Sequence, residues 1–267
     1  MCGIVGYIGP KQAAPLLLEA LEKLEYRGYD SAGLAILGGN GLSVCKAKGR
    51  LSVLFDRTEG GATMPGTAGI GHTRWATHGE PSDVNSHPHL SHSGRVAVVH
   101  NGIVENYAEL REFLTEHGYE FQSDTDTEIV AQLVDFYYHG DPVKAVRDAE
   151  SLLSGSYALG IAFAAHPDLL IAVRKDSPLI LGLGEGENFI ASDIPALLKH
   201  TREIVRLDER ELAVLTRAGV SVYDRFGDPV EKVPEHIAWD VSAAEKGGYA
   251  HFMLKEIMEQ PTAIRNT

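Results

Sequence analysis

The most constraining feature of this sequence is a cysteine at position 2, directly before an apolar run that begins the chain. The opening residues are Met1-Cys2-Gly3-Ile4-Val5-Gly6, and the apolar residues over 3–8 predict a buried strand. Removal of the initiator methionine, which is usual before a small residue, would leave Cys2 with a free α-amino group. A thiol and an amine with a pKa of about 7.7–8.0 would then share one residue, as a nucleophile with its own base. Cys2 could equally be a small buried residue at the head of a strand, and its position alone leaves both interpretations open.

Length and composition indicate a globular protein and exclude several classes of function. The chain has 267 residues, of which 44% are hydrophobic and 23% charged, enough for one large domain or two small ones. No apolar run approaches the roughly 20 residues of a membrane span, and the N-terminus has no signal-peptide pattern. The two cysteines, Cys2 and Cys45, form no Cys-x-x-Cys pair, which favours a reducing cytoplasm and a structural role for Cys45. The formal net charge of −13 argues against a nucleic-acid partner.

The first part of the chain predicts strands, helices and one long loop. Apolar runs predict strands at 32–37, 42–47, 67–72 and 95–100 and a helix over about 11–26. Further helices are expected at 104–117, 126–138 and 142–153, the second with a capping box from Thr125 to Glu128. Residues 73–94, rich in His, Pro, Ser and Gly, predict a long ordered loop, and such loops are usually functional.

The later part of the chain predicts mostly strands. Apolar runs at 156–165, 169–174, 179–183 and 211–216 alternate with turns, with a short helix near 194–200. Because strands and helices segregate instead of alternating strictly, we expect an α+β layered sandwich rather than a doubly wound sheet. From about Val233 the chain becomes polar and irregular, and 252–264 resembles the start of another element. We therefore expect a further domain to follow.

Two arginine-containing segments could contribute to a site. Arg74 stands at the end of a predicted strand, before Trp75, where an arginine can bind a carboxylate through two hydrogen bonds. The alternative is a surface arginine beside a core tryptophan. Arg27-Gly28 stands between a predicted helix and a strand, and on its own it indicates a helix-ending glycine turn.

Two further segments offer hydrogen-bond donors and a carboxylate. Asn101-Gly102 follows a buried strand, so a side-chain amide and a backbone N–H could converge on one oxyanion. An ordinary Asn-Gly turn is the more common explanation. Asp126 falls in the first turn of a predicted helix, where a carboxylate complements the helix dipole. It could also bind a substrate ammonium group.

Taken together and in order, these segments resemble the class II glutamine amidotransferases. The sequence is most similar to members that also contain a sugar-phosphate isomerase part. This similarity is seen at Tyr29-Asp30, Trp75-Ala76-Thr77-His78 and Ile103-Val104-Glu105-Asn106. Amidophosphoribosyltransferase, a purine-pathway relative, is the nearest alternative within the same fold. The resemblance covers nearly the whole chain and rests on five segments: Cys2-Gly3-Ile4-Val5-Gly6, Arg27-Gly28-x-x-Ser31-Ala32-Gly33, His72-Thr73-Arg74-Trp75-Ala76-Thr77-His78-Gly79, His100-Asn101-Gly102 and Thr125-Asp126-Thr127-Glu128.

The resemblance implies a fold, a domain organisation and partners. The fold is the four-layer αββα sandwich of the N-terminal nucleophile hydrolases. Residues 2–232 would form the glutaminase domain, and 233–267 a linker to a sugar-phosphate isomerase domain that receives ammonia and makes glucosamine-6-phosphate. The longer enzyme is expected to be a cytoplasmic homo-oligomer. This chain alone would hydrolyse L-glutamine to glutamate and ammonia.

The resemblance also implies roles for individual residues. Cys2 would form a γ-glutamyl thioester with its own amine as base, and Asn101 and Gly102 would hold the oxyanion. Arg74 would bind the substrate α-carboxylate and Asp126 its α-ammonium group. The remaining residues would line, close or support the pocket: Thr77 and His78 line it, Trp75 lies on the loop that closes it, and Arg27 supports the nucleophile.

Other interpretations remain at this stage. An amide hydrolase or peptidase with an N-terminal cysteine would use the same nucleophile, and a catalytically silent lobe would bind glutamine without turnover. His87-Pro88-His89 resembles a metal-ligand pair, but a zinc site usually needs four spaced ligands. The family uses no metal or other cofactor for this chemistry, so none is expected.

Overall fold

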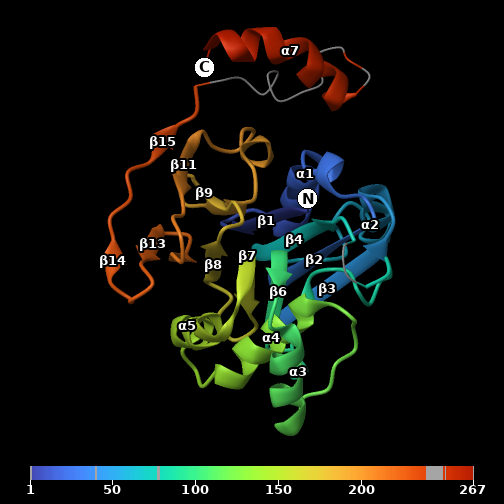
Figure 1. Cartoon of the computed structure of the whole chain (residues 1–267), viewed down its shortest axis with the longest axis vertical. Helices are drawn as coiled ribbons and strands as arrows, with labels where there is room; N and C mark the ends of the chain where they lie inside the picture. Colours follow the sequence, from blue (N-terminus) through green and yellow to red (C-terminus); the bar gives the residue numbers. More distant parts are fainter. Residues whose placement is uncertain (1, 40, 77–78, 239–248, 250, 267) are drawn as a thin grey trace.

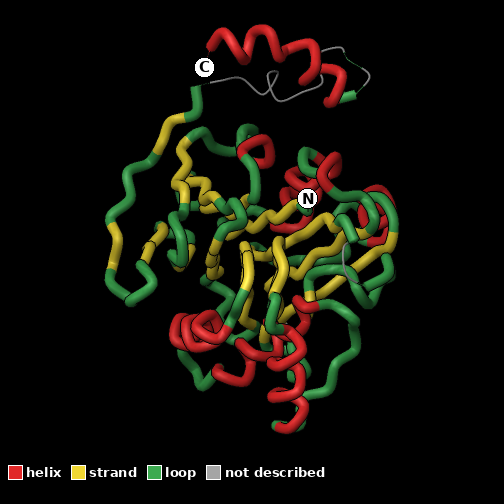
Figure 2. The backbone as a smooth tube through the Cα atoms, viewed as in Figure 1, coloured by secondary structure: helices red, strands yellow, loops and turns green. Residues whose placement is uncertain are grey.

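Two antiparallel sheets lie face to face, and helices cover the outer side of each (Figures 1 and 2). The computed structural model describes residues 2–39, 41–76, 79–238, 249 and 251–266. The arrangement confirms the predicted four-layer αββα sandwich.

The first sheet carries the N-terminal strand at its centre. Within the described residues it has the order β15-β11-β9-β10-β1-β4-β2-β3. Its strands are β1 (Gly3–Ile8), β2 (Ser31–Gly38), β3 (Gly41–Lys48), β4 (Ala68–Arg74), β9 (Ile180–Leu183), β10 (Asn188–Ala191), β11 (Glu203–Arg206) and β15 (Glu235–His236).

The second sheet has the order β14-β13-β12-β8-β7-β6-β5 in the same part of the chain. Its strands are β5 (His89–Leu90), β6 (Val96–Val104), β7 (Gly155–Phe163), β8 (Leu170–Lys175), β12 (Leu212–Leu215), β13 (Val220–Tyr223) and β14 (Pro229–Val230).

Helices α1 and α2 pack on the first sheet, and α3–α5 on the second (Figure 1). The described helices, with two short 3₁₀ turns, are α1 (Ala13–Glu22), η1 (Glu25–Arg27), α2 (Leu51–Arg57), α3 (Tyr107–Glu116), α4 (Asp126–Tyr137), α5 (Pro142–Leu152), η2 (Ile194–Ala196) and α7 (Phe252–Asn266).

Strand β1 is buried on both faces because it lies inside a four-layer structure. Ile4 and Ile8 pack between the two sheets, whereas Val5 and Tyr7 belong to the apolar cluster under α1. Alternate side chains of a strand point to opposite faces, so a continuous apolar run suits this position. The burial fixes the head of β1, and with it Cys2, against neighbouring strands.

The predicted elements are found, with several differences in extent. The first helix is shorter than expected and ends in the 3₁₀ turn η1, and α2 was not predicted. Strand β6 runs through Asn101-Gly102, which pair with Ala158 and Tyr157 of β7. Asn101-Gly102 is therefore part of a ladder and does not form a turn.

The predicted capping box at the start of α4 is wrong. Thr125 is the N-cap residue, but its side chain makes no capping hydrogen bond and lies 2.9 Å from His89 Nε2. Glu128 accepts hydrogen bonds from the backbone N–H and hydroxyl of Ser123, both at 2.6 Å. Glu128 thus closes the loop before the helix, and the Thr125 N–H donates to Ser123 Oγ at 3.3 Å instead.

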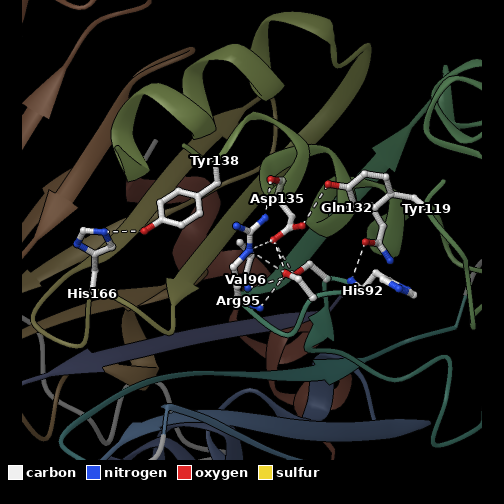
Figure 3. A network of polar contacts seen from close by, with 10 residues as sticks. His92, Arg95, Val96, Tyr119, Gln132, Asp135, Tyr138 and His166 are labelled. Carbon is white, nitrogen blue, oxygen red and sulfur yellow. Dashed lines mark hydrogen bonds and ion pairs between the residues drawn. The ribbon is translucent and has the colours of Figure 1, made fainter. Parts of the chain in front are cut away.

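A buried carboxylate joins α4 to the β5–β6 hairpin (Figure 3). Asp135 Oδ1 accepts from Ser93 Oγ at 2.6 Å, Arg95 Nε at 3.0 Å and Ser91 Oγ at 3.2 Å. Asp135 Oδ2 accepts from the Tyr119 hydroxyl at 3.2 Å. Since α4 begins at Asp126 and β6 carries Asn101, this network fixes two parts of the candidate site relative to each other.

The end of the chain lies outside the two sheets. Helix α7 is placed apart from the sandwich (Figure 1), whereas β15 pairs with β11 and Ile237 is 2% exposed in the core under α1. The sandwich therefore continues past residue 232.

In the described part of the chain, no helix has the length and apolar character needed to cross a membrane.

Candidate active site

Cys2 stands at the head of β1, where the end of β4 holds its thiol. Gly3 pairs with Thr73 of β4, which brings Trp75 beside the cysteine. The Trp75 N–H donates to Cys2 Sγ at 3.2 Å, and Cys2 Sγ lies 3.5 Å from the Trp75 carbonyl oxygen. The thiol is half-buried, so it is both positioned and accessible from one side.

The surroundings of Cys2 favour the neutral thiol. Burial raises the pKa of Cys2 above its ordinary value. The Trp75 hydrogen bond and the Arg74 charge oppose this effect, and Asp30 adds to it. Because the thiolate is the nucleophile, the site needs a nearby base to take the thiol proton during reaction.

Asn101 reaches Cys2 from the opposite sheet. Its Nδ2 donates to the Cys2 carbonyl oxygen at 3.0 Å, and its Oδ1 lies 2.9 Å from His72 Nε2. Gly102 follows with φ +131°, and a Cβ atom at this position would lie 2.0 Å from the Ser156 carbonyl oxygen. Only glycine fits there, which leaves its backbone close to the site without a covering side chain.

Arg74 is the last residue of β4 and is 4% exposed. Its Nη2 donates to the Gly79 carbonyl oxygen at 3.2 Å. Burial lowers the pKa of Arg74, while Cys2, Asp126 and Asp30 oppose that shift. A buried guanidinium with this set of neighbours is suited to receive a carboxylate, because an added anion offsets the desolvation cost.

Asp126 is the first residue of α4, and its side chain is 16% exposed. Its Oδ2 accepts from the Val104 backbone N–H at 2.8 Å and lies 4.0 Å from His100 Nδ1. Burial lowers the pKa of His100, so this histidine is neutral and no ion pair forms. Asp126 therefore brings an anionic group to the wall of the pocket.

Five of the predicted residues line one small pocket. They are Cys2, Arg74, Trp75, Gly102 and Asp126. The cavity has a volume of about 30 Å³, which accommodates water rather than an amino acid. Binding of a larger substrate requires the walls of this pocket to move apart, and Trp75, which is 44% exposed, is one of the residues that form them.

Of the other four predicted residues, Asn101 contacts the Cys2 carbonyl but is not part of this pocket wall, and the remaining three are not seen in the pocket. Thr77 and His78 lie outside the described residues. Arg27 forms an ion pair with Asp193 at 2.5 Å and is absent from the pocket wall. The neighbouring Gly28 lies closer to the site than the Arg27 side chain does, because a Cβ atom at Gly28 would lie 2.7 Å from the Trp75 backbone nitrogen.

Several residues of the site were not predicted from the sequence. The pocket wall also contains His87, His100, Thr125 and Thr127, and Asp30 accepts from the Ala76 N–H at 2.9 Å. Most of them stand inside the segments that carry the family resemblance. Their position in the sequence next to residues with expected roles is the pattern that could have predicted them.

The histidines near the site pack as neutral rings. His72 and His87 stack with centroids 4.2 Å apart, and His87 meets His89 edge-on at 5.0 Å. Burial lowers the pKa of each of the three. Among the described residues, no group of three or more His, Cys, Asp or Glu side chains is arranged to hold a metal ion.

A cysteine at the head of a central strand, inside an αββα sandwich and beside a buried arginine, defines a class II glutamine amidotransferase domain. The family model described as "Glutamine amidotransferase domain" matches residues 58–249, and the chain belongs to this family. The predicted family membership is confirmed.

Among curated relatives, the glutamine–fructose-6-phosphate aminotransferases (isomerizing) of Caldanaerobacter subterraneus subsp. tengcongensis and Clostridium perfringens are each 60% identical over the whole chain. The chain spans 44% of the length of each.

Two solved structures are also similar to this chain. The glutamine phosphoribosylpyrophosphate amidotransferase of B. subtilis is 25% identical with a TM-score of 0.72, and an allosteric regulatory enzyme of purine biosynthesis is 27% identical with a TM-score of 0.74. Each likeness covers 84% of this chain and 49% of the other.

Proposed function

We propose that this chain hydrolyses L-glutamine to L-glutamate and ammonia through a γ-glutamyl thioester on Cys2. The observation that carries the proposal is the convergence of Cys2, Arg74 and Asp126 on one pocket. A thiol, a cation and an anion match the amide, the α-carboxylate and the α-ammonium group of glutamine. Thr77, His78 and Trp75 would complete and close the pocket around the bound amino acid.

In the proposed reaction the α-amine of Cys2 takes the thiol proton as Sγ attacks the amide carbon. The amide oxygen becomes an oxyanion that accepts hydrogen bonds from Asn101 Nδ2 and the Gly102 N–H. The protonated amine then gives its proton to the leaving nitrogen, ammonia departs, and the thioester remains. Water adds to the thioester with the amine again as base, which releases glutamate and restores the thiol. A retained Met1 would tie the amine into a peptide bond and remove this base.

The whole enzyme would use the released ammonia. By similarity to the relatives named above, we propose that residues 2–232, together with β15 and Ile237, form the glutaminase domain. The chain after Ile237 would then lead to a sugar-phosphate isomerase domain that converts fructose-6-phosphate to glucosamine-6-phosphate. A homo-oligomeric assembly in the cytoplasm belongs to the same proposal. The identity of 60% with these relatives, against 25–27% with the purine-pathway structures, favours this assignment over an amidophosphoribosyltransferase.

Substrate selectivity tests the proposed activity. The chain with Cys2 as its first residue is expected to release ammonia from glutamine. It should release far less from asparagine, whose shorter side chain cannot place its amide at Cys2 while Arg74 and Asp126 hold the α-groups. It should also release far less from a glutamine analogue without the α-carboxylate, which cannot make the proposed contact with Arg74. Cys2→Ala is expected to abolish the reaction. Equal rates on all three amides would indicate a general amide hydrolase. Saturable glutamine binding without ammonia release would indicate a regulatory lobe.

A further inference from the structure

We infer that His72 is a positioning residue, which holds the side-chain amide of Asn101 in the orientation that presents its NH₂ group to the developing oxyanion. The inference rests on the proposed function, since it concerns the oxyanion of that reaction. It assigns a role to a buried side chain that does not line the pocket.

The position of His72 allows it to act across the sandwich. His72 lies in β4 of the first sheet, paired with Ile4 and Gly33, and is fully buried. Its ring crosses the space between the sheets to β6. There Nε2 lies 3.1 Å from the His100 carbonyl oxygen and 2.9 Å from Asn101 Oδ1.

The backbone carbonyl of His100 determines which ring nitrogen carries the proton. A carbonyl oxygen can only accept a hydrogen bond, so Nε2 must be the donor and Nδ1 the unprotonated nitrogen. This agrees with the surroundings of Nδ1, which is buried without a hydrogen-bond partner among the described residues. Burial lowers the pKa of His72 to about 3, so the ring keeps one neutral form throughout the physiological range.

The fixed Nε2–H in turn selects one orientation of the amide. If the Asn101 amide rotated by a half-turn, its NH₂ group would face the Nε2–H, and two donors would meet in the buried space between the sheets. A second contact favours the same orientation of the Asn101 amide, because its Nδ2 donates to the Cys2 carbonyl oxygen at 3.0 Å. A flipped amide would instead present an oxygen to the oxyanion and repel it.

Two substitutions separate this role from simple packing. His72→Phe keeps a ring and removes the donor, whereas His72→Gln keeps an N–H near the position of Nε2. For His72→Phe we expect kcat for glutamine to fall about 10- to 100-fold, a part of the effect of losing an oxyanion donor, with KM changed less than about threefold. His72→Gln is expected to recover most of the lost kcat. Equal losses in kcat and KM for both variants, or an unchanged kcat in His72→Phe, would overturn the inference.

Two inhibitors provide a readout that does not depend on turnover. The γ-aldehyde analogue of glutamate forms a thiohemiacetal by addition of Cys2 Sγ to its carbonyl carbon, with the thiol proton retained in the adduct. Its affinity is expected to fall in His72→Phe by about the same factor as kcat, while the affinity for glutamate stays near that of the wild type. Parallel losses for both ligands would indicate a general structural role and contradict the inference.

The tautomer itself can be measured in the wild-type chain, even if His72→Phe does not fold. Nitrogen-15 NMR of labelled histidine is expected to show His72 protonated at Nε2 and not at Nδ1, without change between pH 5 and pH 8. A proton on Nδ1 would overturn the inference. A wild-type chain that neither hydrolyses glutamine nor binds the aldehyde would overturn the proposed function as well, whereas an active wild type with an indifferent His72→Phe would overturn the inference alone.

Discussion

At the scale of single residues, the site combines buried charges with a thiol that is kept neutral. Burial dominates at both Cys2 and Arg74, raising the pKa of the thiol and lowering that of the guanidinium. A buried charge costs desolvation free energy, which a ligand group of opposite charge can offset. The proposed pairing of Arg74 with the α-carboxylate and of Asp126 with the α-ammonium group of glutamine would act in this way.

Removing either charge is expected to weaken glutamine recognition. Arg74→Ala and Asp126→Ala should each lower kcat/KM for glutamine at least about 100-fold, mainly through KM, because a charged substrate group would be desolvated without a partner. Steady-state kinetics would measure this, with circular dichroism as a check that each variant folds. Wild-type kcat/KM in both folded variants would contradict the assignment.

At the scale of elements, the Asp135 network connects α4 to the β5–β6 hairpin. Burial alone would raise the pKa of Asp135, but the hydrogen bonds from Arg95 and Ser93 outweigh it and lower the pKa below its ordinary value. A lowered pKa in the folded state means that the carboxylate stabilises the fold above the unfolded-state pKa of about 3.9. That contribution is lost as the pH falls through the folded-state pKa.

Asp135→Asn is therefore expected to reduce the free energy of unfolding by about 2–4 kcal/mol at pH 7, because a buried ionic acceptor loses its charge. The loss should become smaller as the pH approaches 3. Urea unfolding of both proteins at several pH values would measure the difference. Asp148→Asn provides a control, since this acid forms an exposed pair with Lys144 within α5 and should cost less than about 1 kcal/mol. A pH-independent difference for Asp135→Asn would contradict the account.

The sequence predicted those elements that have long apolar runs or clear helical periods. The strands β1–β4, which contain apolar runs, and the helices α3–α5, which have helical periods, are of this kind. The sequence did not predict the short strands β13, β14 and β15, which lie at or next to the edge of a sheet. Their two to four residues carry too little pattern. Such strands form because a neighbouring strand offers unpaired backbone groups.

The sequence also predicted the residues of the candidate site better than the contacts between them. Cys2, Arg74 and Asp126 could be assigned from the family resemblance. The Asn-Gly turn considered as the alternative at Asn101-Gly102 and the capping role expected of Glu128 were based on local statistics. The pairing with β7 and the hydrogen bonds from Ser123 to Glu128 override them. The contact between His72 and Asn101 joins two sheets, so no local pattern in the sequence predicts it.

At the scale of the whole molecule, the sandwich and α7 are distinct parts. Strand β15 and Ile237 complete the first sheet and its core, whereas α7 lies apart from both sheets (Figure 1). The sandwich therefore includes residues as far as Ile237.

Two truncations test this boundary. A chain ending at residue 238 is expected to keep the melting temperature and glutaminase activity of the full chain. A chain ending at Lys232 loses β15 and Ile237 and should be less stable by about 2–4 kcal/mol, the usual cost of removing one large buried side chain. Differential scanning calorimetry would measure both. Equal stability of the two truncated chains would contradict a sandwich that extends past residue 232.

We expect Cys2 to act as a nucleophile with a free amine in a pocket that binds glutamine. Intact mass spectrometry before and after incubation with a diazoketone analogue of glutamine tests it most directly. We predict a mass without Met1, a gain of a single covalent adduct located on Cys2, and protection by excess glutamine. Loss of Met1 without any adduct, or an adduct on Cys45 that glutamine does not prevent, would contradict it.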